Sequence, residues 1–294
     1  MNVMAGFADT IPGERDHARM DDESDLPYRL ARIGRLATDV RAVVLEMIHR
    51  AGSGHVGSSL SCVDLVSVLK FDQMGPAGGG DVFVLSKGHA APTWYAALMV
   101  SGELDRGEIG TLRRIDSRLQ GHPDRSRLDL VDVSTGALGQ GLSVALGRAQ
   151  AKRLRGDRST AYCLSGDGEL QEGQMWEAVM YAGASGLSNV VLLVDHNRSQ
   201  NDGTLDEVLP LHPLAERFRA FHWHVQDVNG HSHLAVRDAV INARAHRLQP
   251  SVIIAHTRKG YLGPGEVLLN GAHSGTLTTE VYRDALAYLG RVSS

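Results

Sequence analysis

Short apolar runs alternate with longer stretches of helical spacing along most of the chain. Residues 189–194 (NVVLLV) are apolar throughout, which is typical of a strand that is covered on both faces. Residues 138–155 place apolar side chains at helical spacing and end in basic residues, where cations suit the helix dipole. The same patterns predict further strands at residues 81–85, 160–164, 223–228 and 252–255, and further helices at residues 26–50, 58–70, 90–101, 173–185, 234–247 and 279–289.

This alternation predicts an α/β fold, with a parallel sheet and helices on both of its faces. In such sheets, ligands bind outside the carboxyl ends of the strands, and glycine-rich polar segments follow the predicted strands here. We therefore expect a functional site at that edge. The chain has no internal repeat, so we expect one domain over residues 26–294. Residues 1–25 contain seven acidic and two basic residues, and we expect a flexible acidic arm there.

Composition and charge narrow the class of protein. Hydrophobic residues make up 43% and charged residues 22%, as expected for a globular chain that buries a substantial core. The formal net charge of -4 argues against a nucleic-acid partner. We find neither a secretory signal nor an apolar run near the roughly 18–20 residues that span a bilayer, and we expect a cytoplasmic protein without membrane contact. Cys62 and Cys163 lie in apolar surroundings without CxxC spacing, which predicts two buried thiols.

Oxygen-bearing residues follow two of the predicted strands. Gly166-Asp167-Gly168 comes directly after one strand, and Asn197 follows the next strand along the chain. A carboxylate, an amide oxygen and a main-chain carbonyl at Ser199 would supply half of an octahedral shell for Mg²⁺, or for another divalent cation such as Ca²⁺ or Mn²⁺. The glycines let a phosphate approach the backbone, and the cation would balance its charge against Asp167. The pattern therefore favours a site for a metal-bound diphosphate.

The same segment resembles the thiamine-diphosphate motif, in which GDG is followed at this spacing by an asparagine. The resemblance extends to the transketolase family. The matching segments are 51–61 (AGSGHVGSSLS), 85–91 (LSKGHAA), 121–123 (GHP), 135–141 (TGALGQG), 229–231 (NGH), 259–260 (KG) and 272–274 (AHS). His196 stands where the motif often has another asparagine, and Val56 where the family more often has proline.

The resemblance implies roles for individual residues. It assigns the metal to Asp167, Asn197 and the Ser199 carbonyl. Among the catalytic residues, Glu172 matches a glutamate at the subunit interface that couples two cofactor sites. Three histidines match residues that face the reacting carbon, where a neutral imidazole near pH 7 can take or give a proton: His55, His122 and His273. The cofactor-binding residues are His89, Gly136, Leu138, Gly166, Asp167, Gly168, Asn197 and His273.

A transketolase also needs a pyrimidine-binding domain, for which this chain leaves no room. The resemblance therefore implies a separate partner subunit that carries this domain, in an α2β2 heterotetramer. Together the subunits would transfer a two-carbon ketol unit from a ketose phosphate to an aldose acceptor. Two alternatives stay open: a relative in specialised metabolism that uses pyruvate, an unusual or sulfonated sugar, or a carrier protein, and a non-catalytic scaffold that binds or regulates a partner.

Two other groups of residues allow more than one interpretation. Five arginines surround the expected substrate loop, where they form either a solvated surface or an attraction for phosphate. They are Arg113, Arg114, Arg118, Arg125 and Arg127. Five histidines follow one another closely but have no cysteine or acidic partner to complete a zinc site. They are His212, His222, His224, His231 and His233.

Overall fold

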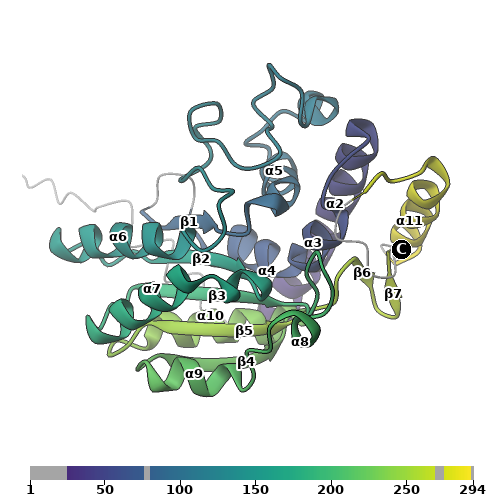
Figure 1. The fold of residues 1–294 in the computed structure, drawn as a ribbon. Helices are drawn as coiled ribbons and strands as arrows, with labels where there is room; N and C mark the ends of the chain where they lie inside the picture. The colour runs from purple at the N-terminus through teal and green to yellow at the C-terminus, as the bar shows by residue number, and fades with distance from the viewer. Residues whose placement is uncertain (1–24, 76–79, 269–274, 293–294) are drawn as a thin grey trace, which may run out of the picture.

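A computed structural model describes residues 25–75, 80–268 and 275–292. The expected arm at residues 1–25 falls almost entirely outside this range, as does His273. Five strands form one parallel sheet in the order β1-β2-β3-β5-β4, which confirms the predicted α/β fold (Figure 1). The strands are β1 (Val82–Leu85), β2 (Ala161–Gly166), β3 (Val190–His196), β4 (His224–Asn229) and β5 (Ser251–His256).

Helices cover both faces of the sheet, because alternate strand residues enter two separate cores. Tyr162 and Leu164 of β2 point into one core, and Cys163 between them points into the other. Cys62 and Cys163 are both buried and free, as predicted. The first core is packed by α2 (Leu26–Ala51), α3 (Val56–Ser61), α4 (Val63–Val68), α5 (Ala91–Val100), α10 (His233–Ala245) and α11 (Thr279–Val292). The second is packed by α6 (Gly141–Leu154), α7 (Gly173–Ala184) and α9 (Leu214–Ala220).

Several elements differ from the predicted ones. The helix expected at residues 58–70 divides at Cys62 into α3 and α4, and a π-helical turn follows at Leu69–Gln73. Helix α6 begins only at Gly141, because Gly139 has a φ of 86°, which no helix accepts. Apolar spacing also gave no indication of three short elements. These are α9, the helix α8 (Leu205–Val208) and the hairpin of β6 (Tyr261–Gly263) with β7 (Glu266–Val267).

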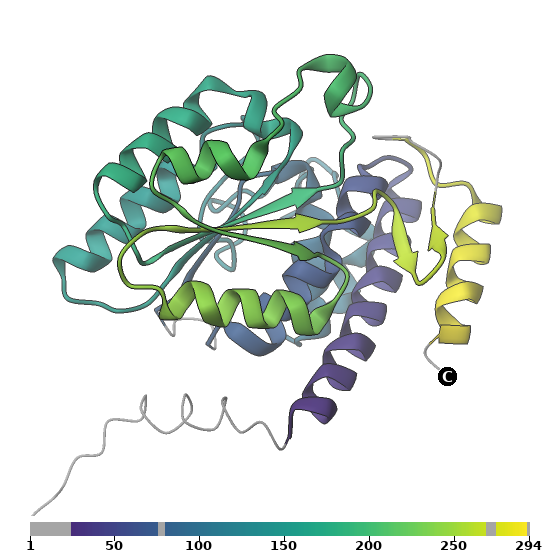
Figure 2. The same cartoon turned by 90° about the horizontal axis from the view of Figure 1, so that it is seen from below.

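The strand register brings the ends of β2, β3 and β5 to one edge. Gly166 pairs with Asp195, and Asp195 pairs with Ala255, so the segments that follow these strands begin side by side. Figure 2 shows the strands ending together beside α2, with the hairpin and α11 beyond it. In the part of the chain that the structure describes, every helix is too short or too polar to cross a bilayer.

Candidate functional site

A cavity of about 330 Å³ lies at the carboxyl ends of β2 and β3. It lies where ligands bind in open parallel sheets. Most residues that the sequence singled out line this one cavity, although they come from four separate segments of the chain. They are His89, Leu138, Gly166, Asp167, Gly168, Glu172, Asn197 and Ser199.

Two oxygen-bearing side chains in the cavity are held in place by the backbone. Asp167 accepts hydrogen bonds from the amide of Gly168 (2.8 Å) and from that of Arg198, whose φ of 60° turns its N–H toward the carboxylate. The amide oxygen of Asn197 accepts a bond from the Ser199 amide (3.1 Å). A carboxylate, an amide oxygen and a nearby main-chain carbonyl form the oxygen set that a hard divalent cation prefers. The residues present therefore fit a magnesium-type ion.

The same edge leaves room for a phosphate. A Cβ at Gly168 would lie 3.0 Å from Oε1 and 3.2 Å from Cβ of Gln200, so glycine keeps this edge uncrowded. Lys259 contacts the segment that follows Asn197, with Nζ 3.0 Å from Oγ of Ser199. Burial and the charge of Lys87 lower the pKa of Lys259. An anion beside Asp167 would be repelled without a cation, so the glycine edge and the oxygen set fit a metal-bound diphosphate together.

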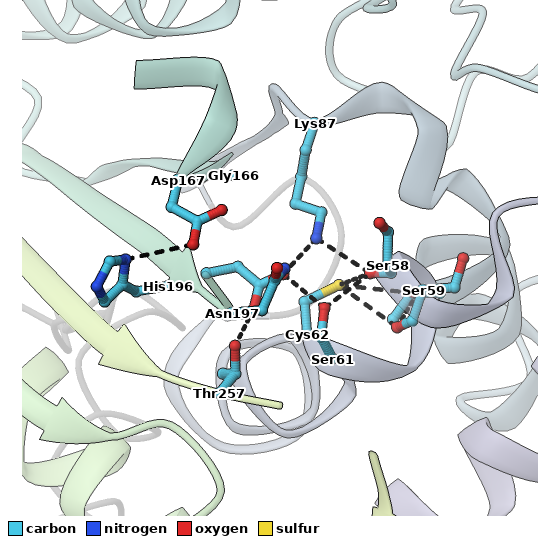
Figure 3. A network of polar contacts seen from close by, with 12 residues as sticks. Ser58, Ser59, Ser61, Cys62, Lys87, Gly166, Asp167, His196, Asn197 and Thr257 are labelled. Carbon is cyan, nitrogen blue, oxygen red and sulfur yellow. Dashed lines mark hydrogen bonds and ion pairs between the residues drawn. The ribbon is translucent and has the colours of Figure 1, made fainter. Parts of the chain in front are cut away.

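Lys87 and Asp195 form a buried ion pair next to Asn197, and Figure 3 shows Lys87 and Asn197 of this network. The carboxylate of Asp195 receives hydrogen bonds from Lys87, from Ser61 (2.6 Å), from Thr257 and from the Asn197 amide nitrogen (3.1 Å). The Lys87 side chain is 1% exposed and that of Asp195 is 0% exposed. Burial opposes both charges, but their attraction outweighs it, so the pKa of Lys87 is raised and that of Asp195 is lowered. Because Asp195 holds the amide nitrogen, it fixes the direction of the Asn197 oxygen.

His196 lies behind the Asp167 carboxylate, where its Nδ1 is 3.3 Å from Oδ2 of Asp167 (Figure 3). This nitrogen is buried and has no hydrogen-bond partner within the described residues. The ring also contacts His256 edge to face, with 5.1 Å between centroids. The departure from the familiar motif therefore leaves Asn197 free to face the cavity and places an imidazole against the proposed metal ligand instead.

Two further histidines, His55 and His122, do not line the cavity but contact other predicted site residues. The ring of His55 is 5.2 Å from that of His89 between centroids. Burial, and then the charge of Arg113, lower the pKa of His55 to about 4, and the same two causes lower that of His122. His122 packs on Gly136, where an added Cβ would come within 3.3 Å of its ring. Both imidazoles are therefore neutral near pH 7 and can accept a proton.

Sequence reasoning gave no role to Lys87, Asp195, Lys259 or the buried Glu169. Glu169 accepts bonds from Ser86 (2.5 Å) and from the Gly139 amide (2.9 Å), and burial raises its pKa. All four lie inside or next to the motifs that the sequence displays. Their positions within the motifs are a signal that could have identified them. Their pairing could not be predicted from sequence spacing, because the partners follow different strands.

Three of the five arginines have other partners in the protein. Arg118 pairs with Glu108, Arg127 with Asp124, and Arg125 donates to the Val131 carbonyl. Within the described ranges, no three histidine, cysteine, aspartate or glutamate side chains are placed so that they could hold a metal ion.

Comparison with known proteins identifies the family. Residues 34–291 match the family described as the thiamine diphosphate binding domain of transketolase. The chain belongs to the transketolase family. It is 39% identical over 259 residues to the 6-deoxy-6-sulfo-D-fructose transketolase subunit SqwG of a Clostridium species, covering 86% of this chain and 94% of that protein. It is 35% identical over 258 residues to an apulose-4-phosphate transketolase subunit of Phocaeicola vulgatus, covering 84% and 89%.

Solved transketolases share the fold. The transketolase of Campylobacter jejuni superposes with a TM-score of 0.81 at 31% identity, over 88% of this chain and 42% of that one. The transketolase of Leishmania mexicana gives 0.80 at 27% identity, over 88% and 41%. The chain therefore spans less than half the length of these solved relatives, and nearly the full length of the two subunits named above. The predicted family, its thiamine-diphosphate-binding domain and its α/β fold are confirmed.

Proposed function

We propose that this chain is the diphosphate-binding subunit of a two-component transketolase, which transfers a two-carbon ketol unit from a ketose phosphate to an aldose acceptor. One observation carries the proposal. Asp167, Asn197 and the Ser199 backbone meet beside a glycine edge at the carboxyl ends of β2 and β3. The two subunits of named transketolases that align over nearly their full length support the division into components.

Thiamine diphosphate, when bound, supplies the nucleophilic carbon and the electron sink of the reaction. In our proposal, Asp167, Asn197 and the Ser199 carbonyl hold Mg²⁺, or Ca²⁺ or Mn²⁺ in its place. Phosphate oxygens would lie against the backbone glycines and two histidines, and the cofactor's rings beside the turn at residues 136–138. The residues proposed for these contacts are His89, Gly136, Leu138, Gly166, Gly168 and His273.

The neutral histidines of the site are suited to proton transfer. His55 stays unprotonated at pH 7, because its pKa is lowered to about 4 by burial and by the Arg113 charge, so it is ready to accept a proton from a substrate hydroxyl. We assign the same kind of task to His122 and His273, at substrate oxygens on either side of the bond that breaks.

The remaining parts of the active site belong to a partner. We propose a second subunit that carries the pyrimidine-binding domain, contributes most of the sugar-phosphate contacts and assembles with this chain as an α2β2 heterotetramer in the cytoplasm. Glu172, which borders the cavity and packs on Gly139, would lie at that interface and couple the two cofactor sites.

The test uses both subunits with Mg²⁺, thiamine diphosphate, xylulose 5-phosphate and a panel of aldoses. Asp167→Asn should weaken the affinity for the Mg²⁺–cofactor pair by about 100-fold and abolish ketol transfer, because it removes the only carboxylate of the proposed oxygen set. Asp206→Asn is the matched control, since the Asp206 side chain is 71% exposed. Unchanged transfer by Asp167→Asn would instead support a scaffold.

A second candidate function is transfer with another donor or acceptor. It is favoured by the 39% identity to a subunit named for a sulfonated sugar and by the unusual His196 beside Asp167. The same assay decides between the two, with sulfonated sugars and pyruvate included as donors. Turnover of pyruvate without ketol transfer to any aldose would contradict the main proposal.

A further inference from the structure

A second buried carboxylate, Asp64 of α4, lies outside the cavity. Its side chain is 3% exposed. Three nitrogens contact its carboxylate oxygens: Nη2 of Arg41 at 2.5 Å, Nδ1 of His231 at 2.8 Å and Nε2 of His233 at 2.8 Å. Burial raises its pKa, but the Arg41 charge and the two histidine bonds outweigh burial and hold the pKa of Asp64 well below its usual range. Asp64 is therefore a fixed negative charge.

The bonds around His231 determine which of its nitrogens carries the proton. Nε2 accepts a hydrogen bond from the backbone amide of Arg258 (2.8 Å), so this nitrogen has no proton of its own. Nδ1 must then carry the proton and donate it to Asp64. His231 thus links a buried carboxylate to the backbone N–H of residue 258 as a neutral imidazole.

The segment that His231 holds runs from the end of β5 to the hairpin. Each of its five residues has a contact that fixes its place: Thr257 donates to Asp195, Arg258 to His231, Lys259 to Ser199, Gly260 to the Gly57 carbonyl, and Tyr261 stacks on His231. We call residues 257–261 the connecting segment.

Tyr261 makes the end of the connecting segment rigid. Its ring lies 3.5 Å from the ring of His231 between centroids, and the Arg41 guanidinium lies 5.3 Å from the same ring. Arg41 also donates to the Tyr261 carbonyl (3.2 Å). Two of the three partners of Asp64 therefore hold the connecting segment, His231 at residue 258 and Arg41 at residue 261, on either side of Lys259.

We propose that Asp64 and His231 form a positioning pair that places the Lys259 ammonium at the metal and diphosphate end of the cavity. The inference rests on the proposed function, because that function supplies the anion, a diphosphate, that the Lys259 ammonium would contact. Asp64 and His231 touch neither cofactor nor substrate. They act through the backbone of residue 258, whose neighbour Lys259 reaches Ser199.

Two replacements of His231 separate its two bonds. In His231→Asn, the amide nitrogen takes the place of Nδ1, so the bond to Asp64 is kept and the bond from Arg258 is lost. In His231→Gln, the amide oxygen takes the place of Nε2, so the bond from Arg258 is kept. His233→Asn is the matched control, because it removes a bond to Asp64 without touching the connecting segment.

Affinity for Mg²⁺–thiamine diphosphate and for inorganic pyrophosphate is measured by calorimetry on the full chain with its partner. Lys259→Met should weaken both by about tenfold and His231→Asn by about fivefold, while His231→Gln, which keeps the bond from Arg258 but loses the one to Asp64, loses only about twofold and His233→Asn stays near wild type. The double variant His231→Asn, Lys259→Met should bind no more weakly than Lys259→Met alone. Additive losses in the double variant, or equal losses for His231→Asn and His231→Gln, would overturn the proposal.

A second measurement does not depend on the cofactor. Acetylation of the Lys259 amine, followed by mass spectrometry, should be several times faster in His231→Asn than in wild type and unchanged in His233→Asn. An unchanged rate in His231→Asn refutes the positioning pair even if the chain binds no cofactor. Wild-type protein that binds neither ligand refutes only the proposed function. Should His231→Asn fail to fold, Asp64→Asn, which keeps the shape of the side chain, takes its place in the same cycle with the same expected coupling.

Discussion

Asp195 and Asp64 are two buried carboxylates, and different sets of neighbouring side chains stabilise their negative charges. Asp195 lies at the end of β3, pairs with Lys87 and directly holds the amide of Asn197. Asp64 lies on α4, pairs with Arg41 and reaches the site only through His231. Each gathers several donors, because a buried ion is tolerated only when its charge and its lone pairs are satisfied.

The difference shows two ways in which a buried charge can organise a site. The Asp195 network contacts Asn197, a proposed metal ligand, and therefore orients that ligand directly. The Asp64 network contacts a main-chain amide and thereby sets the path of a whole segment. The connecting segment joins the two, since Thr257 bonds to Asp195 and Arg258 bonds to His231.

The largest expected effect comes from removing one carboxylate at a time. Asp195→Ala leaves the Lys87 ammonium buried without its partner and should lower the free energy of unfolding by about 3–5 kcal/mol. Asp64→Ala should cost less, about 2 kcal/mol, because Arg41 keeps its bond to the Tyr261 carbonyl. Urea unfolding of both variants measures the difference.

A control for this comparison removes both charges. Lys87→Met with Asp195→Leu should recover part of the stability that Asp195→Ala loses, because no unpaired ion remains. Equal losses for Asp195→Ala and Asp64→Ala would erase the distinction between the two networks.

The next effect tests how tightly the connecting segment is held. Gly260 has a φ of 73°, and a Cβ there would lie 2.0 Å from the Leu268 carbonyl oxygen. Gly260→Ala should therefore destabilise the chain by roughly 3 kcal/mol and weaken pyrophosphate binding with it. Gly265→Ala is the matched control, because its φ is 83° but a Cβ meets nothing within 4 Å, so only the backbone cost of about 1 kcal/mol applies. Similar losses in thermal unfolding would show that the segment is free to move.

The smallest effect concerns His55, whose pKa is lowered in part by the charges of Lys87 and Lys259. Its folded pKa of about 4 is lower than the ordinary 6.5, owing to burial and to the charges of Arg113, His122, Lys87 and Lys259. Between pH 6.5 and pH 4 the unfolded chain binds a proton that the folded chain does not. The free energy of unfolding therefore decreases as the pH is lowered through this window. Relative to His55→Asn, the wild type should lose about 1 kcal/mol between pH 7 and pH 5, a value kept small because the imidazole is only half buried.

Urea unfolding at both pH values measures that loss, and the NMR titration of His55 sharpens the comparison. Lys259→Met should raise the pKa of His55, because one nearby positive charge disappears. Parallel pH dependence of wild type and His55→Asn would contradict the lowered pKa.

Much of the fold could be predicted from the sequence, because its elements are local. The strands, the long helices and the GDG and asparagine segments each appear as continuous patterns, and the structure has them within a few residues. The division of residues 58–70 at Cys62 and the late start of α6 could not be predicted. The first involves a hydrogen bond from Ser61 back to the Ser58 carbonyl, and the second depends on Gly139 lying against Glu172.

The sequence by itself determined the α/β fold and the family and indicated the oxygen donors that we propose for the metal, because motif residues keep a fixed spacing along the chain. Only the tertiary structure decided which buried carboxylate pairs with which cation. Lys87 and Asp195 are 108 positions apart, and His231 and Asp64 are 167 apart. Strand register and helix packing bring them together, and burial then makes the pairing obligatory, because a charge removed from water has to find its partner inside the protein.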